Sequence, residues 1–257
     1  MRVFRPLKAT RRRALLAAAV VGLLVLVPAA LAGATTIARL TGRVTPGITA
    51  FTTTPQSVRL TVNADFSGQG SEIGSLTRAI VEFSHGARVQ GQYFPSCDPV
   101  RLQRAHGRPS ACPKGSRLGS GTAEGQSAHI REKLAVTVYN GPHGRSLLFW
   151  LAGSQPADVT GLINAPLVAI HSREYGYRLT MNVPPSLQQL LPGEPTQVTH
   201  FDATVGGTTT TRAHGKTTRH GYIEVLTCPP GALVPAHGDF FFSDQPQATS
   251  NSYLSCG

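Results

Sequence analysis

The stretch CDPVRLQRAHGRPSACPKGSRLGSG, residues 97–121, separates a short lead-in from a long series of predicted strands. Asp98 is a good helix N-cap, Pro99 suits the first helical position, and Gly107 can end a helix in left-handed geometry. These signals predict a helix of about two turns over residues 99–106. A helix this short is marginal in water, so we expect a disulfide between the flanking cysteines to hold it. A glycine-rich strand follows.

The cysteine count supports such a disulfide. The chain has four cysteines, Cys97, Cys112, Cys228 and Cys256. An even number in an oxidising compartment predicts two disulfides, although four cysteines allow three connectivities. We expect the sequential pairs Cys97–Cys112 and Cys228–Cys256, because each closes a short loop around one local unit. A zinc site is the alternative, and it is disfavoured because no two cysteines are close in sequence.

The N-terminus has the three parts of a secretory signal peptide. Basic residues precede an apolar run from Ala14 to Leu31, and small residues follow it. This order predicts that residues 1–32 form a signal peptide. The run is also long enough for an uncleaved membrane anchor. The arginines at 11–13 allow twin-arginine as well as Sec export. In each case we expect a secreted, extracellular or cell-surface protein.

The remaining chain alternates apolar and polar residues with the period of β-strands. Residues 33–56, rich in Thr, Gly and Pro, predict a linker or lead-in strand, and residues 57–257 predict one domain. The apolar run 147–151 predicts a central strand covered on both faces, whereas the polar segment 206–220 predicts an exposed hairpin tip. A second short helix is expected over residues 186–191. The fold expected is all-β, an antiparallel β-sandwich, Ig-like or jelly-roll-like, with one or two short helices.

Charge gives little support for nucleic-acid binding. The chain has 24 Lys and Arg against 13 acidic residues, a net charge of +11. Six of those cations precede Ala14, which leaves 18 against 13, an excess of +5. That excess is mild and spread along the chain, so we expect no nucleic-acid partner. A local basic cluster surrounds the predicted disulfide and is expected to be a solvated loop face, with polyanion binding as the alternative. Its members are Arg101, Arg104, Arg108, Lys114 and Arg117.

The order of motifs resembles a module of secreted β-rich proteins from high-GC Gram-positive bacteria. The matching elements are a cysteine about fifteen residues before Cys112-Pro113-Lys114-Gly115-Ser116, then Leu118-Gly119-Ser120-Gly121, Val138-Tyr139-Asn140-Gly141 and the closing segment Cys228 to Cys256. The similarity covers residues 85–257. It implies a β-rich, disulfide-containing architecture and a cell-surface address. No activity is established for that group, and no site residue carries over.

Histidine and carboxylate residues are the candidates for chemistry. His200-Phe201-Asp202 and His237-Gly238-Asp239 each place an imidazole and a carboxylate on one face of a strand. With His214 and His220 they could form a surface metal site. Spacing this loose arises by chance, so we expect no metal and no cofactor.

Carboxylates and aromatic residues suggest carbohydrate chemistry as a second class. A glycosidase needs two carboxylates facing each other across a cleft, and nothing in the sequence pairs those near apolar strands, Glu174, Asp202, Glu224 and Asp239. Aromatic residues could form a sugar-stacking platform, but period-two placement favours core packing. They are Tyr93, Phe94, Tyr175, Tyr177, Tyr222 and Tyr253.

These observations favour a non-catalytic extracellular module with a structural or binding role. The alternative is a carbohydrate-active enzyme or glycan-binding domain on a jelly-roll-like sandwich. A cell-wall or extracellular glycan is the partner to consider. Contact with a membrane is expected only through the N-terminal segment, and only if that segment stays uncleaved.

Overall fold

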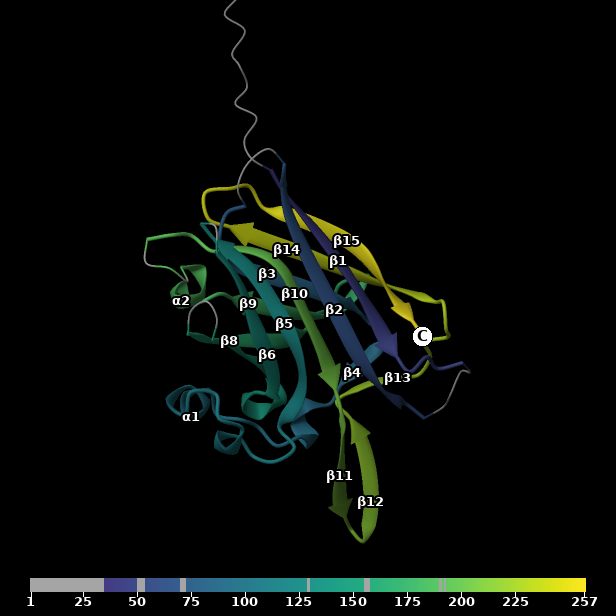
Figure 1. The fold of residues 1–257 in the computed structure, drawn as a ribbon. Helices are drawn as coiled ribbons and strands as arrows, with labels where there is room; N and C mark the ends of the chain where they lie inside the picture. The colour runs from purple at the N-terminus through teal and green to yellow at the C-terminus, as the bar shows by residue number, and fades with distance from the viewer. Residues whose placement is uncertain are drawn as a thin grey trace, which may run out of the picture. The chain divides into compact units, whose positions relative to one another are not determined.

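The main sheet of the protein closes on itself as a barrel (Figure 1). The computed structural model describes residues 35–49, 54–69, 73–128, 130–154, 158–189, 191 and 193–257. The predicted signal peptide, residues 1–32, lies outside the described residues. The described residues form fifteen strands and two α-helices. No helix among them has the length and apolar character needed to cross a membrane.

Eleven strands make up the barrel wall. In spatial order they are β1 (Thr35–Thr45), β15 (Ala248–Cys256), β14 (Leu233–Phe242), β3 (Leu76–Ser84), β9 (Tyr175–Asn182), β8 (Val159–Ala169), β7 (Ser146–Gly153), β6 (Ile130–Asn140), β5 (Arg117–Ser127), β10 (Gln197–Gly206) and β2 (Gln56–Gln69). Closure occurs at β1, which pairs with β2 on one side and β15 on the other. The β1–β15 pair is parallel and the other wall pairs are antiparallel.

The remaining elements lie around this wall. β13 (Ile223–Val225) pairs with the first residues of β2, 56–58, and β4 (Ala87–Val89) pairs with β13. β11 (Thr208–Ala213) and β12 (Lys216–Gly221) form a separate hairpin that extends away from the barrel (Figure 1). Its strands are mostly exposed, as expected for the polar segment 206–220. The helices are α1 (Pro99–Arg104) and α2 (Pro185–Gln188).

The expectation of an antiparallel sandwich is therefore wrong. A sandwich and a closed barrel share the same alternation of apolar and polar residues along each strand. They differ in whether the edge strands pair, and that pairing joins residues distant in sequence. Here residues 35–45, inside the stretch expected to be a linker or lead-in, form β1 and contact both edges. The two edges that a sandwich would leave open are joined.

Alternation along the strands fills the barrel interior with apolar side chains. Leu134, Val136 and Val138 of β6 are buried, whereas their neighbours Lys133 and Ala135 are exposed. Aromatic rings pack edge to face inside, with the centroids of Phe66 and Phe240 4.9 Å apart and those of Phe149 and Phe201 5.9 Å apart. The interior is thus a hydrophobic core that holds the barrel together.

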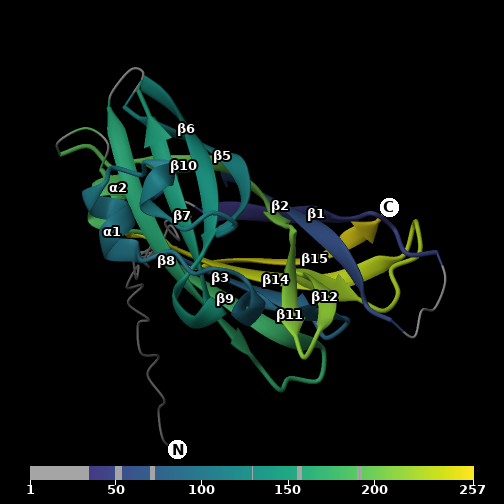
Figure 2. The same cartoon turned by 90° about the horizontal axis from the view of Figure 1, so that it is seen from below.

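The segment around α1 covers part of the outer face of the wall, next to β8 (Figure 2). The Asp98 side chain accepts a hydrogen bond from the Arg101 amide at 2.9 Å, which confirms the predicted N-cap. α1 ends at Arg104, two residues before the predicted end, and Gly107 follows with φ of 69°. A small outer core lies between this segment and the strands, made of Cys97, Leu102, Cys112, Tyr139, Leu148 and Trp150. Because of this cover, all of residues 147–151 are buried, as expected for a strand covered on both faces.

Both sequential disulfides are present. Cys97 is bonded to Cys112 and Cys228 to Cys256. The first holds the α1 segment, and the second joins the chain after β13 to the last residue of β15. These bonds indicate an oxidising environment.

Candidate functional site

The barrel encloses two neighbouring apolar cavities, of about 100 Å³ and about 80 Å³. The residues that line both are Ala64, Met181, Phe201 and Phe240. The larger cavity extends toward β4 and β13, and the smaller toward α2, where Leu187 lines it. Apolar cavities of about 150 Å³ stay dry and accept benzene-sized molecules. Each cavity alone is smaller than this, so a benzene-sized ligand would need both.

One buried carboxylate interrupts the mainly apolar lining of the smaller cavity. Glu132 lies on β6 two residues before Leu134, so strand alternation turns it to the inside of the barrel. Its side chain is buried, with 4% exposed, and its Oε1 atom has no hydrogen-bond partner. A buried polar group without a partner costs about 1–3 kcal/mol. The position is therefore unfavourable for folding alone.

A second buried carboxylate shows how such a group is normally satisfied. Glu224 on β13 is also buried, with 9% exposed. Its Oε1 accepts the Gly221 amide at 2.7 Å, and its Oε2 accepts from the side chain of Gln90 at 3.3 Å. Glu224 thus has a structural role in joining β13 to its surroundings. Glu132 has no comparable partner among the described residues.

A polar pocket of about 380 Å³ lies next to the smaller cavity. Glu124, Gly125 and Glu132 line both spaces. Glu124 pairs with Lys133 at 2.6 Å, and the hydrogen bond from Lys133 lowers the pKa of Glu124. The ladder between β10 and β5 is irregular between Val198 and His200, at the edge of this pocket. Glu132 therefore lines both the apolar interior and a polar pocket.

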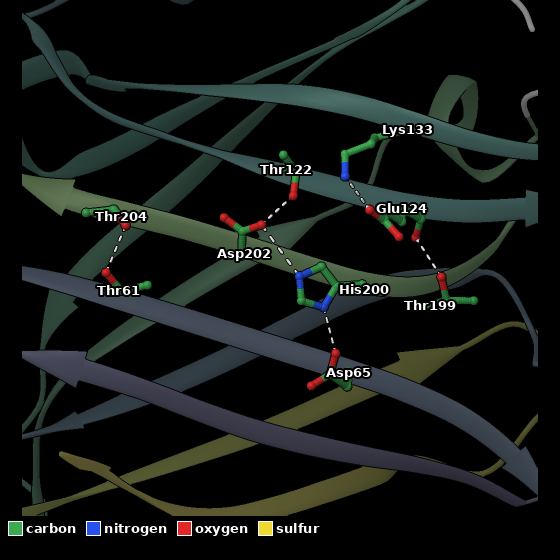
Figure 3. A network of polar contacts seen from close by, with 9 residues as sticks. All are labelled: Thr61, Asp65, Thr122, Glu124, Lys133, Thr199, His200, Asp202 and Thr204. Atoms are coloured by element: carbon green, nitrogen blue, oxygen red, sulfur yellow. Dashed lines mark hydrogen bonds and ion pairs between the residues drawn. The ribbon is translucent and has the colours of Figure 1, made fainter. Parts of the chain in front are cut away.

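The outer face of β2, β10 and β5 holds a network of polar side chains (Figure 3). His200 lies between two carboxylates, with Nδ1 2.6 Å from Asp65 and Nε2 3.5 Å from Asp202. The hydrogen bond to Asp65 raises the pKa of His200, although partial burial opposes the shift. Thr122 donates to Asp202, and Thr61 is 2.8 Å from Thr204. Cross-strand register brings these residues together.

The second predicted pair lies elsewhere. His237 on β14 is 3.2 Å from Asp239 and 2.7 Å from Asn251. In the wall, β14 is separated from β10 by β15, β1 and β2, so the two His–Asp pairs do not form one site. His214 and His220 lie on the hairpin, where His220 stacks on Tyr93. Among the described residues, no group of three or more His, Cys, Asp or Glu side chains could hold a metal ion.

The five cations around the first disulfide are exposed, and none forms an ion pair with a described residue. The four carboxylates considered for glycosidase chemistry are not joined to each other by any hydrogen bond or ion pair between described residues. They lie before β9, on β10, on β13 and on β14.

Core packing holds for only some of the aromatic candidates. Phe94 and Tyr222 are buried, whereas Tyr93 is 41% and Tyr253 62% exposed. The expectation is wrong for these last two. Tyr253 lies on β15, the strand that pairs with β14 and β1, and Tyr93 is held by the ring of His220 instead of by the interior.

Sequence reasoning missed Glu132, although a signal for it exists. The alternation of Leu134, Val136 and Val138 extended one step toward the N-terminus puts Glu132 on the same apolar face. A carboxylate on a core-facing position is a buried polar group, which is more informative than an exposed one. The cavities themselves have no sequence signal, because they depend on the closure of the barrel. A scan against family models and searches of curated proteins and of solved structures found no match to the chain.

Proposed function

We propose that the protein is a non-catalytic binding protein whose barrel interior takes a small, largely apolar ligand. The observation that supports the proposal is the pair of neighbouring apolar cavities inside the closed wall. Ligand sites are concave, mainly apolar spaces with a few placed polar groups. The interior, with Glu132 at one end, has this composition. Closed barrels are known to hold single small ligands in this way.

We further propose that the binding protein acts outside the cytoplasm. The predicted signal peptide and the two disulfides support an exported location. The two disulfides also stabilise the folded protein, because they restrict the unfolded chain. Detection of the protein in the medium or at the cell surface, and its loss from there when residues 1–32 are deleted, tests this location. Retention of the full-length chain inside the cell would contradict it.

Toluene, an apolar molecule without a polar group, is a suitable probe of the interior. We expect saturable binding of toluene by the purified protein in calorimetry, with an increase in thermal stability. Ala64→Phe should abolish this binding because Ala64 lines both cavities.

The control is Ala135→Phe, which adds the same volume on the exposed outer face of β6. That variant should bind toluene like the unchanged protein. Absence of saturable toluene binding, or equal loss in both variants, would contradict the proposed function.

A further inference from the structure

We propose that Glu132 selects the ligand, and that the ligand is a small amphipathic amine with an apolar body and a cationic head. This inference rests on the proposed function and specifies the chemistry of its site. The apolar body would occupy the interior formed by the two neighbouring cavities, and the ammonium group would donate to the carboxylate of Glu132.

The first argument is the missing partner. Glu132 is 96% buried and Oε1 accepts no hydrogen bond, whereas the buried Glu224 accepts bonds at both oxygens. A buried carboxylate that serves only the fold is expected to be paired or hydrogen-bonded. The neighbouring cations do not supply the partner, since Lys133 pairs with Glu124 and Arg131 is exposed. A donor from outside the chain would satisfy the free oxygen.

The second argument is that the wall accommodates the buried carboxylate. Gly125 lies directly across from Glu132 on β5 and lines both the apolar cavity and the polar pocket. Gly153 of β7 is also close, because a Cβ atom added there would lie 2.6 Å from Oε1 of Glu132. A side chain at position 153 would therefore collide with the carboxylate, so the glycine there lets Glu132 hold its buried position.

The third argument is the position of Glu132 between two kinds of surface. On one side the cavity is lined by aliphatic and aromatic residues such as Leu134, Leu151 and Phe240. On the other side the pocket is lined mainly by charged and amide side chains. An amphipathic molecule matches this change in polarity along its own length. The carboxylate, which accepts hydrogen bonds and carries negative charge when ionised, selects a donating cation over an anion.

Three probes with the same ring and different heads test the inference: toluene, benzylamine and benzoate. Calorimetry of the unchanged protein at neutral pH should show benzylamine binding at least about tenfold more tightly than benzoate and more tightly than toluene. Glu132→Gln should weaken benzylamine about tenfold or more and change toluene about twofold or less, because the apolar cavity remains.

Glu174→Gln is the matched control. It removes the same charge from an exposed position before β9 that lines neither apolar cavity nor the polar pocket. Benzylamine affinity should stay within about twofold of the unchanged protein. An equal loss in both variants would show a general attraction of cations and overturn the role of Glu132.

Thermal unfolding of Glu132→Leu distinguishes a ligand-binding role from a structural one. Without ligand, this variant should unfold at a higher temperature than the unchanged protein, because it removes an unpartnered buried carboxylate. A fall in unfolding temperature, together with unchanged benzylamine preference in Glu132→Gln, would overturn the inference. If toluene binds but benzylamine has no advantage over benzoate, the inference fails and the proposed function stands. If no probe binds, both fail.

Discussion

The polar side chains on the two faces of the barrel wall differ in whether they have hydrogen-bond partners. On the outer face, His200 contacts Asp65 and Asp202, and each of these carboxylates has a cross-strand neighbour to accept from. On the inner face, Glu132 is buried with one oxygen unpartnered. The outer network follows from strand register and needs no ligand to explain it. Neither strand register nor packing explains the inner carboxylate. We therefore place the proposed binding function in the barrel interior.

The largest expected effect comes from the inner face. Phe240→Ala removes a ring that is 2% exposed and packs against Phe66 at a centroid distance of 4.9 Å. The lost contacts and the enlarged cavity should lower the free energy of unfolding by about 3–5 kcal/mol. Equilibrium denaturation in urea, with the disulfides intact, measures this.

The outer-face control is Thr204→Ala, whose hydroxyl contacts Thr61 on a partly exposed surface. It should cost under about 1 kcal/mol. Similar losses for the two variants would remove the distinction between the faces.

The cover on the outer face should give the next largest effect. Replacing both Cys97 and Cys112 with serine removes the disulfide that closes the loop between them. The two residues are 15 positions apart in the sequence. The loop-entropy model predicts a loss of about 3 kcal/mol. Trp150 lies in the core under this loop, so its fluorescence should shift to longer wavelength as water reaches it. An unchanged emission maximum would mean that α1 remains packed without the disulfide.

Gly107→Ala tests how closely that cover fits the wall. Gly107 has φ of 69°, and a Cβ atom there would overlap the indole of Trp150. Backbone strain and steric overlap together should cost about 1–3 kcal/mol. Gly215→Ala is the matched control, because Gly215 also has positive φ but no neighbour near an added Cβ. Equal losses of thermal stability in the two variants would show that backbone strain alone is responsible. They would argue against close packing of Gly107 on Trp150.

The smallest expected effect belongs to the outer polar network. The pKa of His200 is raised in the folded state by the hydrogen bond to Asp65, from an ordinary value of 6.5. The resulting stability is fully present below pH 6.5 and is lost as pH rises through the folded pKa. It should amount to less than about 1 kcal/mol, since the groups are partly exposed.

The measurement compares the urea midpoints of the unchanged protein and of His200→Gln. A series from about pH 5 to 9, which spans the usual histidine pKa, isolates the contribution of His200. Subtracting the variant removes the parallel contribution of His237, whose pKa is also raised. A difference that grows with rising pH would contradict the predicted sign.

Local features of the chain were predicted well because their determinants are close in sequence. Asp98 and Pro99 define the start of α1 within a few residues, and the exposed hairpin 208–221 follows from an almost wholly polar segment. The disulfide pairing was also expected, since each bond closes a short loop. The site was predicted less well: the His–Asp pairs proved to lie apart on the outer face, and Glu132 was passed over.

The sequence by itself determined strands, turns, the cap of α1 and the disulfides, because alternation, capping and short-loop closure act over a few residues. Only the tertiary structure decided that β1 joins β2 to β15 and closes the wall. That pairing joins residues near position 40 to residues near 65 and 255. The entropy lost in closing these loops is offset only when the whole sheet has formed. Closure also created the interior. It turned Glu132 from one charged residue among several into a buried carboxylate facing an apolar cavity.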